Sequence, residues 1–249
     1  MQNGKASGLD GFNVDFFIAC WKNFKQDILK VIEDSRRFKT ILKALNASFI
    51  ALIPKQEKAT TPDRLRPIFL CIVVYKIICK VIANKLKPLI LDLVSEEQTR
   101  FVERRQILNN IIQAHEVVHS LNSRKQATMI IQLDPVKVNE KLSWAYIKEV
   151  LRAYSFDHSW IRWVMALVSM ASFTILLNGS PYRTFTPSKG LRQGDTLSHF
   201  LFVLMMEGLG KVIKMENSKA RIQGLKLTLE GTHLVINNLW LIQCCRAFL

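Results

Sequence analysis

Two hydrophobic patterns alternate along this chain, and their combination constrains its fold more than any other feature. Between Val73 and Leu91, apolar residues recur with the 3.6-residue period of an amphipathic helix. Between Phe173 and Thr186, two short strand-like segments, 173–177 and 182–186, flank an Asn178-Gly179 pair, and Asn-Gly supplies the positive φ angles of a tight hairpin turn. Amphipathic helices mixed with antiparallel hairpins are typical of the α+β class, so we expect an α+β fold.

The remaining segments fit the same mixture. We expect further helices over residues 15–40 (as a pair), 106–121, 144–154, 160–170 and 197–215, and strands over 48–54, 128–134, 225–229 and 234–242. Ser143 is the predicted N-cap of the helix that begins at Trp144. With 249 residues, 49% of them apolar, the chain can build a sizeable core as one domain, or as one domain with two lobes.

The chain is strongly basic, with 35 Lys and Arg against 20 Asp and Glu and a net charge of +15. Such an excess indicates a polyanionic partner, nucleic acid first and an anionic membrane surface second, although a solvated basic surface needs no partner. Between Arg64 and Leu91 there are six basic residues and no acidic one. This segment is therefore the strongest local candidate for contacts with phosphates.

Cysteine usage and hydropathy indicate an intracellular protein, nuclear or cytoplasmic, that is not secreted. The five cysteines form no CxxC pair and no even framework, which fits reduced thiols. Lys5 and Asp10 interrupt any apolar signal segment. The longest uncharged run, 163–182, contains Asn178-Gly179 and Pro181, so a helix followed by a strand and a turn fits it better than a membrane span. We expect no membrane partner, and the sequence leaves the oligomeric state open.

The most specific motif is KGLRQGDTLSHFLF, from Lys189 to Phe202. It resembles the G-L-R-Q-G-D-P-L-S-P-x-L-F motif of the reverse transcriptases of plant LINE-type (non-LTR) retrotransposons, with Thr196 and His199 in place of two prolines. Further segments that resemble the family's motifs lie at 5–12 (KASGLDGF), 49–55 (FIALIPK), 65–68 (LRPI), 75–86 (YKIICKVIANKL), 98–107 (QTRFVERRQI), 133–140 (LDPVKVNE) and 177–181 (LNGSP). In the 98–107 segment, Arg104 replaces a glycine of the family.

This resemblance implies a right-hand polymerase fold and RNA-directed DNA synthesis. It implies that residues 1–125 form mainly the fingers and 126–249 mainly the palm of one reverse-transcriptase-like domain, with the thumb absent. The implied partners are an RNA template and an RNA–DNA hybrid.

The resemblance also assigns residues to a nucleotide site. Arg66 falls on the arginine of the family's R-P-I motif, which helps to hold the incoming triphosphate. Asn139 replaces an aromatic residue that screens against a ribose 2′-hydroxyl. Gln193 and Gly194 fall on residues that border the nucleotide. Basic candidates for nucleic-acid binding in the fingers are Lys55, Arg64, Lys76 and Lys80.

The family's catalytic carboxylates are only partly retained. Asp134, at the end of a predicted strand, falls on the first catalytic aspartate. The Asp-Asp pair falls on Asn238 and Leu239, or on Asn237 and Asn238 after a one-residue shift, and no Asp or Glu follows Glu230. The reaction uses two Mg²⁺ ions that need hard, charged oxygen ligands. We therefore expect Mg²⁺ to be bound weakly, by Asp134 if at all, and the hairpin remnant at 232–243 to leave the chain catalytically inactive or nearly so.

Two other functions are consistent with the sequence. The basic fingers could hold RNA or an RNA–DNA hybrid as a non-catalytic binding module. Residues 115–119, His-Glu-Val-Val-His, match the HExxH motif of zinc hydrolases, in which two histidines on one helix face bind Zn²⁺. That motif needs a third ligand, and no signature for one follows it.

Overall fold

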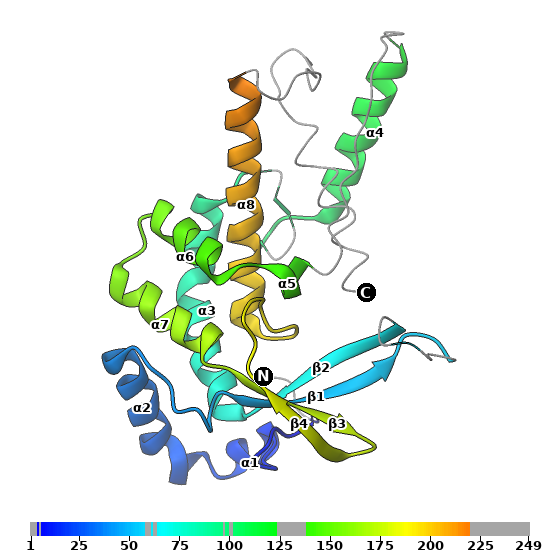
Figure 1. Ribbon diagram of the computed structural model, residues 1–249. Coiled ribbons are helices and arrows are strands. Elements are labelled where there is room, and N and C mark those ends of the chain that lie inside the picture. Colours follow the sequence, from blue (N-terminus) through cyan, green and yellow to red (C-terminus); the bar gives the residue numbers. More distant parts are fainter. Residues whose placement is uncertain are drawn as a thin grey trace. The chain divides into compact units, whose positions relative to one another are not determined.

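The computed structural model describes residues 4, 6–57, 61, 64–96, 98–99, 102–123 and 138–219. This part of the chain mixes helices with a sheet, as expected (Figure 1). The elements are α1 (Val14–Ala19), α2 (Trp21–Phe38), β1 (Ala47–Pro54), β2 (Leu65–Cys71), α3 (Val73–Leu93), α4 (Ile107–Ser123), α5 (Val138–Lys141), α6 (Trp144–Ala153), α7 (His158–Ser169), β3 (Ser172–Leu177), β4 (Ser180–Phe185) and α8 (Thr196–Ser218). The predicted strands at 128–134, 225–229 and 234–242, and the hairpin remnant at 232–243, lie outside the described residues.

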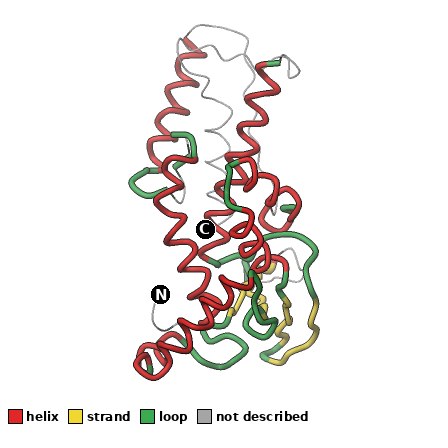
Figure 2. Tube along the Cα trace, turned by 90° about the vertical axis from the view of Figure 1, so that its left-hand side faces the viewer, coloured by secondary structure: helices red, strands yellow, loops and turns green. Residues whose placement is uncertain are grey.

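The sheet joins two hairpins in the order β2-β1-β3-β4. β1 pairs antiparallel with β2, and β3 pairs antiparallel with β4 through the predicted turn, where Asn178 has a φ of 51°. The two hairpins are joined by parallel pairing of β1 with β3, with Ile50 opposite Ile175. Figure 2 draws the strands in yellow, gathered at the lower right of that view. The sequence patterns predicted the β3–β4 hairpin but not the parallel pairing.

The chain divides into two compact units. The first unit comprises Met1–Asn84 and Asn139–His199, and the second comprises Lys85–Val138 and Phe200–Leu249. The sheet, α1, α2, α6, α7 and all of α5 except Val138 belong to the first unit, whereas α3 and α8 each begin in the first unit and continue into the second. The predicted boundary between fingers and palm, at residues 125 and 126, lies outside the described residues and stays a prediction.

Helix α7 is fixed to two other parts of the first unit by buried hydrogen bonds. The Trp163 indole Nε1 donates to the Ser35 hydroxyl on α2 at 2.9 Å, and the Asn46 amide donates to the Leu167 carbonyl at 3.1 Å. Asp157 caps the helix by accepting from the backbone N–H groups of Ser159 and Trp160 at 2.8 and 3.0 Å. This cap explains why α7 begins at His158, two residues before the predicted start.

The predicted N-cap of α6 is right in position but not in mechanism. Ser143 is the residue before the helix, yet its side chain makes no capping hydrogen bond.

Helix α3 follows its predicted amphipathic pattern, with Lys80 and Lys87 exposed. Its buried stripe includes two residues that the sequence pattern did not single out: Tyr75 and Cys79 are 2% and 0% exposed.

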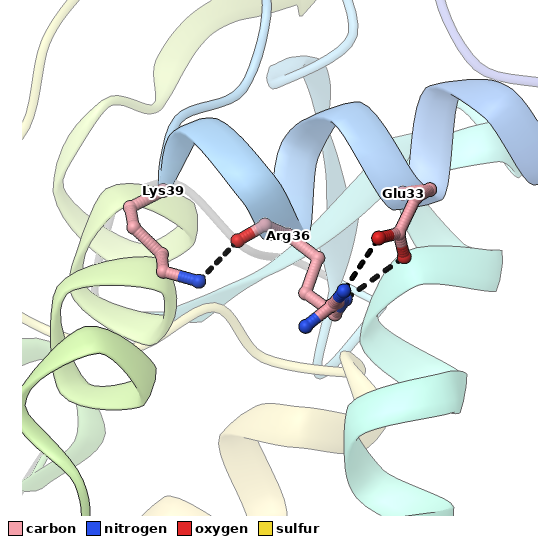
Figure 3. A network of polar contacts seen from close by, with 3 residues as sticks. All are labelled: Glu33, Arg36 and Lys39. Carbon is pink, nitrogen blue, oxygen red and sulfur yellow. Dashed lines mark hydrogen bonds and ion pairs between the residues drawn. The ribbon is translucent and has the colours of Figure 1, made fainter.

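Helix α2 ends in a small polar network on the surface (Figure 3). The Arg36 guanidinium donates to the Glu33 carboxylate, and the Lys39 ammonium group donates to the Arg36 carbonyl. The hydrogen bond from Arg36 is the main cause that lowers the pKa of Glu33, and nearby cations add to it. Cations in the last turn also complement the negative end of the helix dipole. Exposed pairs of this kind contribute little to stability.

One helix in the described part of the chain, Thr196–Glu216 within α8, is long and apolar enough by length and composition to cross a membrane. Its residues Leu201, Phe202, Val203, Leu204 and Met205 are buried. Core helices of soluble proteins meet the same criterion, so the finding by itself assigns no membrane location. The uncharged run at 163–182 forms the end of α7, β3 and the following turn, as predicted.

The replacement of a family glycine by Arg104 generates a stability prediction. Arg104 has a φ of 66°, and the left-handed region costs a non-glycine residue about 1–2 kcal/mol. Glycine would remove this strain but add about 0.5–1 kcal/mol of unfolded-chain entropy. We therefore expect Arg104→Gly to increase the free energy of unfolding, by up to about 1 kcal/mol, as measured by urea denaturation.

The neighbouring arginine is the control. Arg105 donates to the carbonyls of Ser95 and Gln98, the latter at 2.8 Å, so Arg105→Ala should lower the unfolding midpoint. A lower midpoint for Arg104→Gly would contradict the strain argument.

Candidate functional site

The segment from Gly190 to Asp195, here called the Gly190–Asp195 loop, leads from β4 to α8 and is anchored at its first end to the residues around α5. The Gly190 N–H donates to the Leu142 carbonyl at 2.8 Å, and the Leu191 N–H donates to the Asn139 carbonyl at 2.7 Å. The indole of Trp144 donates to the Gly190 carbonyl at 2.9 Å. These bonds bring two predicted motifs together, although about fifty residues separate them in sequence.

Gly190 is required by this close approach. Its φ is +92°, and a Cβ atom there would lie 2.8 Å from the Glu140 carbonyl oxygen and 3.0 Å from that of Asn139. Both neighbours are backbone atoms, which cannot move aside as the end of a flexible side chain can. A side chain at residue 190 would therefore force the loop away from α5.

Arg192 is buried beneath the loop, with only 6% of its surface exposed. Its guanidinium lies over the Tyr75 ring at 4.2 Å and near the Phe173 ring at 5.3 Å, which are cation–π distances. Its Nη2 donates to the Asn46 carbonyl at 3.1 Å and to the Asn46 side-chain oxygen, and its Nη1 donates to the Ser48 hydroxyl at 3.4 Å.

The charge of Arg192 is maintained by its surroundings. Burial lowers the pKa of Arg192, but the nearby Tyr75, Cys71 and Asp195 raise it, and the net shift is upward. The group therefore stays charged, and within the described residues its hydrogen-bond partners are neutral oxygens and a thiol.

Asp195 anchors the second end of the loop. Its carboxylate accepts hydrogen bonds from the Tyr75 hydroxyl at 3.3 Å and from the Ser198 hydroxyl at 3.3 Å. It also accepts from the Leu197 N–H at 3.4 Å, which places it as the N-cap of α8. Burial raises the pKa of Tyr75 well above its usual value, so the phenol stays protonated and acts as the donor.

Gln193 and Gly194 lie between these two buried anchors. Gly194 is exposed and has a φ of +84°. The Gln193 side-chain amide donates to the Glu140 carboxylate at 3.3 Å. The structure thus brings three of the sequence-predicted nucleotide residues, Asn139, Gln193 and Gly194, to one place.

A cavity of about 280 Å³ lies next to this place. Its lining includes Ile50, Phe69 and Phe173 from the sheet, together with Pro67, Glu140 and Arg192. The last three directly follow or precede Arg66, Asn139 and Gln193 in the sequence. The side-chain oxygen of Asn139 is itself buried and has no hydrogen-bond partner among the described residues.

Arg66 lies on the other face of the sheet. Successive side chains of a strand point to opposite faces, and Pro67 and Phe69 on β2 line the cavity. Arg66, between Leu65 and Pro67, is exposed and stands opposite Ile53 of β1. The structure therefore does not bring Arg66 into the cavity that its neighbours line.

The four basic candidates for nucleic-acid binding form two groups in the first unit. Lys55 and Arg64 close the end of the β1–β2 hairpin, where the Lys55 N–H donates to the Arg64 carbonyl at 2.9 Å, and both side chains are exposed. Lys76 and Lys80 lie one turn apart on α3, with Lys80 exposed and Lys76 half-buried. All eight described candidate residues belong to the first unit.

The predicted catalytic positions cannot be placed in the same way. Asp134, Asn237, Asn238 and Leu239 lie outside the described residues. Within the described part of the chain, no group of three or more His, Cys, Asp or Glu is arranged to hold a metal ion. His115 and His119 of the HExxH segment are exposed on α4, and no third ligand gathers beside them among those residues.

Sequence reasoning missed Arg192, Asp195 and Tyr75 as site residues. Arg192 and Asp195 flank Gln193-Gly194 in the motif, which was the available signal. Charged residues in a loop are usually exposed, so their burial could be found only from the structure.

The two glycines of the loop generate a prediction with a built-in control. Gly190 and Gly194 both have φ near +90°, but only Gly190 has atoms within 4 Å of its added Cβ. We expect Gly194→Ala to destabilise the chain by about 1–2 kcal/mol from backbone strain, and Gly190→Ala to cost a further 1–3 kcal/mol or so from the clash. Urea denaturation of both variants measures the difference, and equal costs would contradict the close approach.

A known protein family matches most of this chain. The family described as reverse transcriptase (RNA-dependent DNA polymerase) matches residues 53–228, which include the end of β1, all of β2 and α3, and the Gly190–Asp195 loop. The match confirms the reverse-transcriptase family that the motifs predicted, whereas the plant type of element stays a prediction.

Three relatives come from transposable elements. The uncharacterized 149 kDa protein of transposon TX1 from Xenopus laevis is 25% identical over 207 residues, which cover 83% of this chain and 16% of that protein. The retrovirus-related Pol polyprotein of the type-2 retrotransposable element R2DM from Drosophila melanogaster is 27% identical over 164 residues, with coverages of 66% and 15%. The corresponding polyprotein of the type-1 element R2 from Popillia japonica is 23% identical over 159 residues, with coverages of 64% and 22%.

This chain thus spans less than a quarter of the length of each of these relatives. The family match, in contrast, extends over well over half of the chain itself. The chain therefore belongs to the reverse transcriptase (RNA-dependent DNA polymerase) family.

Proposed function

We propose that this chain is the reverse-transcriptase-like domain of a LINE-type (non-LTR) retrotransposon that binds nucleic acid but no longer polymerises. The relatives from transposable elements support the type of element. In this proposal residues 1–125 form mainly the fingers and residues 126–249 mainly the palm. The chain works inside the cell, in the nucleus or cytoplasm.

The loss of activity rests on one observation, the absence of carboxylates where the family carries its Asp-Asp pair. Asn237 and Asn238 offer neutral amide oxygens, and Leu239 offers no donor. Mg²⁺ prefers charged oxygen ligands in octahedral geometry, so this donor set does not fit the two ions of the family's reaction. Asp134 alone leaves most of their charge uncompensated.

A restoration experiment tests the proposed inactivity. We expect no primer extension on an RNA template by the unaltered chain with Mg²⁺ or Mn²⁺, because each ~1.4 kcal/mol of lost transition-state stabilisation lowers the rate about tenfold. The double variant Asn238→Asp with Leu239→Asp should gain activity, or Asn237→Asp with Asn238→Asp if the register is shifted. The gain should disappear when Asp134→Ala is added. Extension by the unaltered chain that depends on Asp134 would contradict the proposal.

Retained binding is supported by the charge and placement of the basic residues. Net charge is +15, and exposed cations occur at the β1–β2 hairpin end and along α3. Phosphate binding by Lys and Arg does not depend on the metal ligands, because its driving force is the release of counterions from the nucleic acid. An RNA template or RNA–DNA hybrid can therefore be held after the chemistry is lost.

Salt titration tests this binding. We expect the logarithm of affinity for an RNA–DNA hybrid to fall linearly with the logarithm of salt concentration. Arg64→Ala and Lys80→Ala should each reduce the slope by roughly 0.7–0.9 if each residue contacts one phosphate. Lys148→Ala on α6 removes one exposed charge elsewhere in the first unit and serves as the control. Affinity that is independent of salt would rule out this form of binding.

A further inference from the structure

Arg192 is a buried cation whose role the nucleotide assignments leave unexplained. It contacts three separate parts of the first unit: the segment that enters β1, through Asn46 and Ser48; α3, through Tyr75; and β3, through Phe173. It also directly precedes Gln193 in the loop.

We propose that Arg192 is a positioning residue, which fixes Gln193 and Gly194 in the geometry that borders the nucleotide by tying the Gly190–Asp195 loop to the sheet and α3. The inference rests on the proposed reverse-transcriptase-like function together with the predicted nucleotide site, because it assumes that nucleotide binds at this turn. Arg192 itself is buried beneath the loop and acts through its neighbours.

The contacts of Arg192 require a planar face for stacking and several N–H donors at its edge, which arginine combines in one charged side chain. The flat face of the guanidinium lies over the Tyr75 ring, while its edge donates to the Asn46 carbonyl and the Ser48 hydroxyl. Lysine has a compact ammonium group that cannot stack through a planar face and donate in a fixed fork at the same time. Loss of the guanidinium would also leave buried oxygens of Asn46 without a donor, which is costly in a low-dielectric interior.

Tyr75 makes the two anchors of the loop interdependent. Its ring supports Arg192, and its hydroxyl donates to Asp195, three residues further along. A shift of Tyr75 or Arg192 therefore moves both sides of the Gln193–Gly194 turn. The bond from Gln193 to Glu140 is 3.3 Å long and partly exposed, and it is too weak to hold the turn by itself.

The test compares Arg192→Met and Arg192→Lys with the unaltered chain. Arg162→Met, which removes an exposed cation of α7 in the same unit, is the charge-matched control. Three quantities are measured: amide hydrogen exchange of residues 190–195, affinity of the protein–primer–template complex for a fluorescent deoxynucleoside triphosphate, and the urea midpoint of unfolding.

In both Arg192 variants we expect exchange of the loop amides to be about tenfold faster and nucleotide affinity about tenfold weaker, which corresponds to the loss of one well-made interaction. The affinity for the primer–template itself should be unchanged, because phosphate contacts lie elsewhere in the unit. Arg162→Met should match the unaltered chain in all three measurements.

Several outcomes would overturn the inference. Unchanged exchange of the loop amides would show that Arg192 does not hold the turn. Faster exchange with unchanged nucleotide affinity would show that Arg192 stabilises the loop but has no effect on nucleotide binding. Full rescue by lysine would show that charge alone is needed and would reject the stacking argument. Nucleotide binding that is absent in the unaltered chain would overturn the proposed nucleotide site and this inference together.

A second variant covers the case in which Arg192→Met does not fold. Phe173→Leu removes one of the two rings near the guanidinium and keeps an apolar side chain at the same buried position. It should change loop exchange and nucleotide affinity in the same direction by a smaller factor. No change in either quantity would count against the positioning role.

Discussion

The stacking of the Arg192 guanidinium on the Tyr75 ring is the contact on which the first unit depends. A charge buried with no carboxylate at ion-pair distance among the described residues is expensive, and it is tolerated here because the ring faces and the Asn46 and Ser48 oxygens replace the lost water. The same tyrosine donates to Asp195, which caps α8. One aromatic residue of α3 thus connects the sheet, the loop and the start of the next long helix.

A second constraint is the close backbone approach at Gly190. Two backbone hydrogen bonds and the Trp144 indole hold the loop against residues 139–142, and the absence of a Cβ at residue 190 allows that distance. The first glycine of the motif and its two charged residues shape the loop, and the Gln193–Gly194 pair lies between them.

In a protein of this kind, the fold and the catalytic activity depend on different residues, so one can be lost without the other. The residues that shape the loop and the sheet are buried and mutually supporting, so their replacement lowers stability. Under the proposed function, replacement of metal-binding carboxylates by asparagine or leucine removes the charge that the ions require. A chain that lost selection for polymerisation would be expected to keep the first set longer than the second.

Much of the local structure could be predicted from the sequence. Three helices, α3, α4 and α8, lie close to their predicted bounds, as do the Asn178–Gly179 hairpin and the strand at 48–54. They could be predicted because their sequence patterns depend on residues a few positions apart. The motifs predicted the family for the same reason, and the loss of the catalytic carboxylates stays a prediction. The predicted starts of α7 and β3 were off by one or two residues where a cap or a pairing partner set the boundary.

Only the tertiary structure decided the features that depend on distant partners. The parallel pairing of β1 with β3, the burial of Arg192 and Asp195, and the position of Arg66 on the face opposite the cavity have no local signature. Each is set by which surfaces meet after the chain has folded. A charged residue in a loop is normally solvated, and it is buried only where a ring, a carbonyl and a hydroxyl from other segments contact it in the folded protein. Sequence periodicity carries no information about these contacts between distant segments.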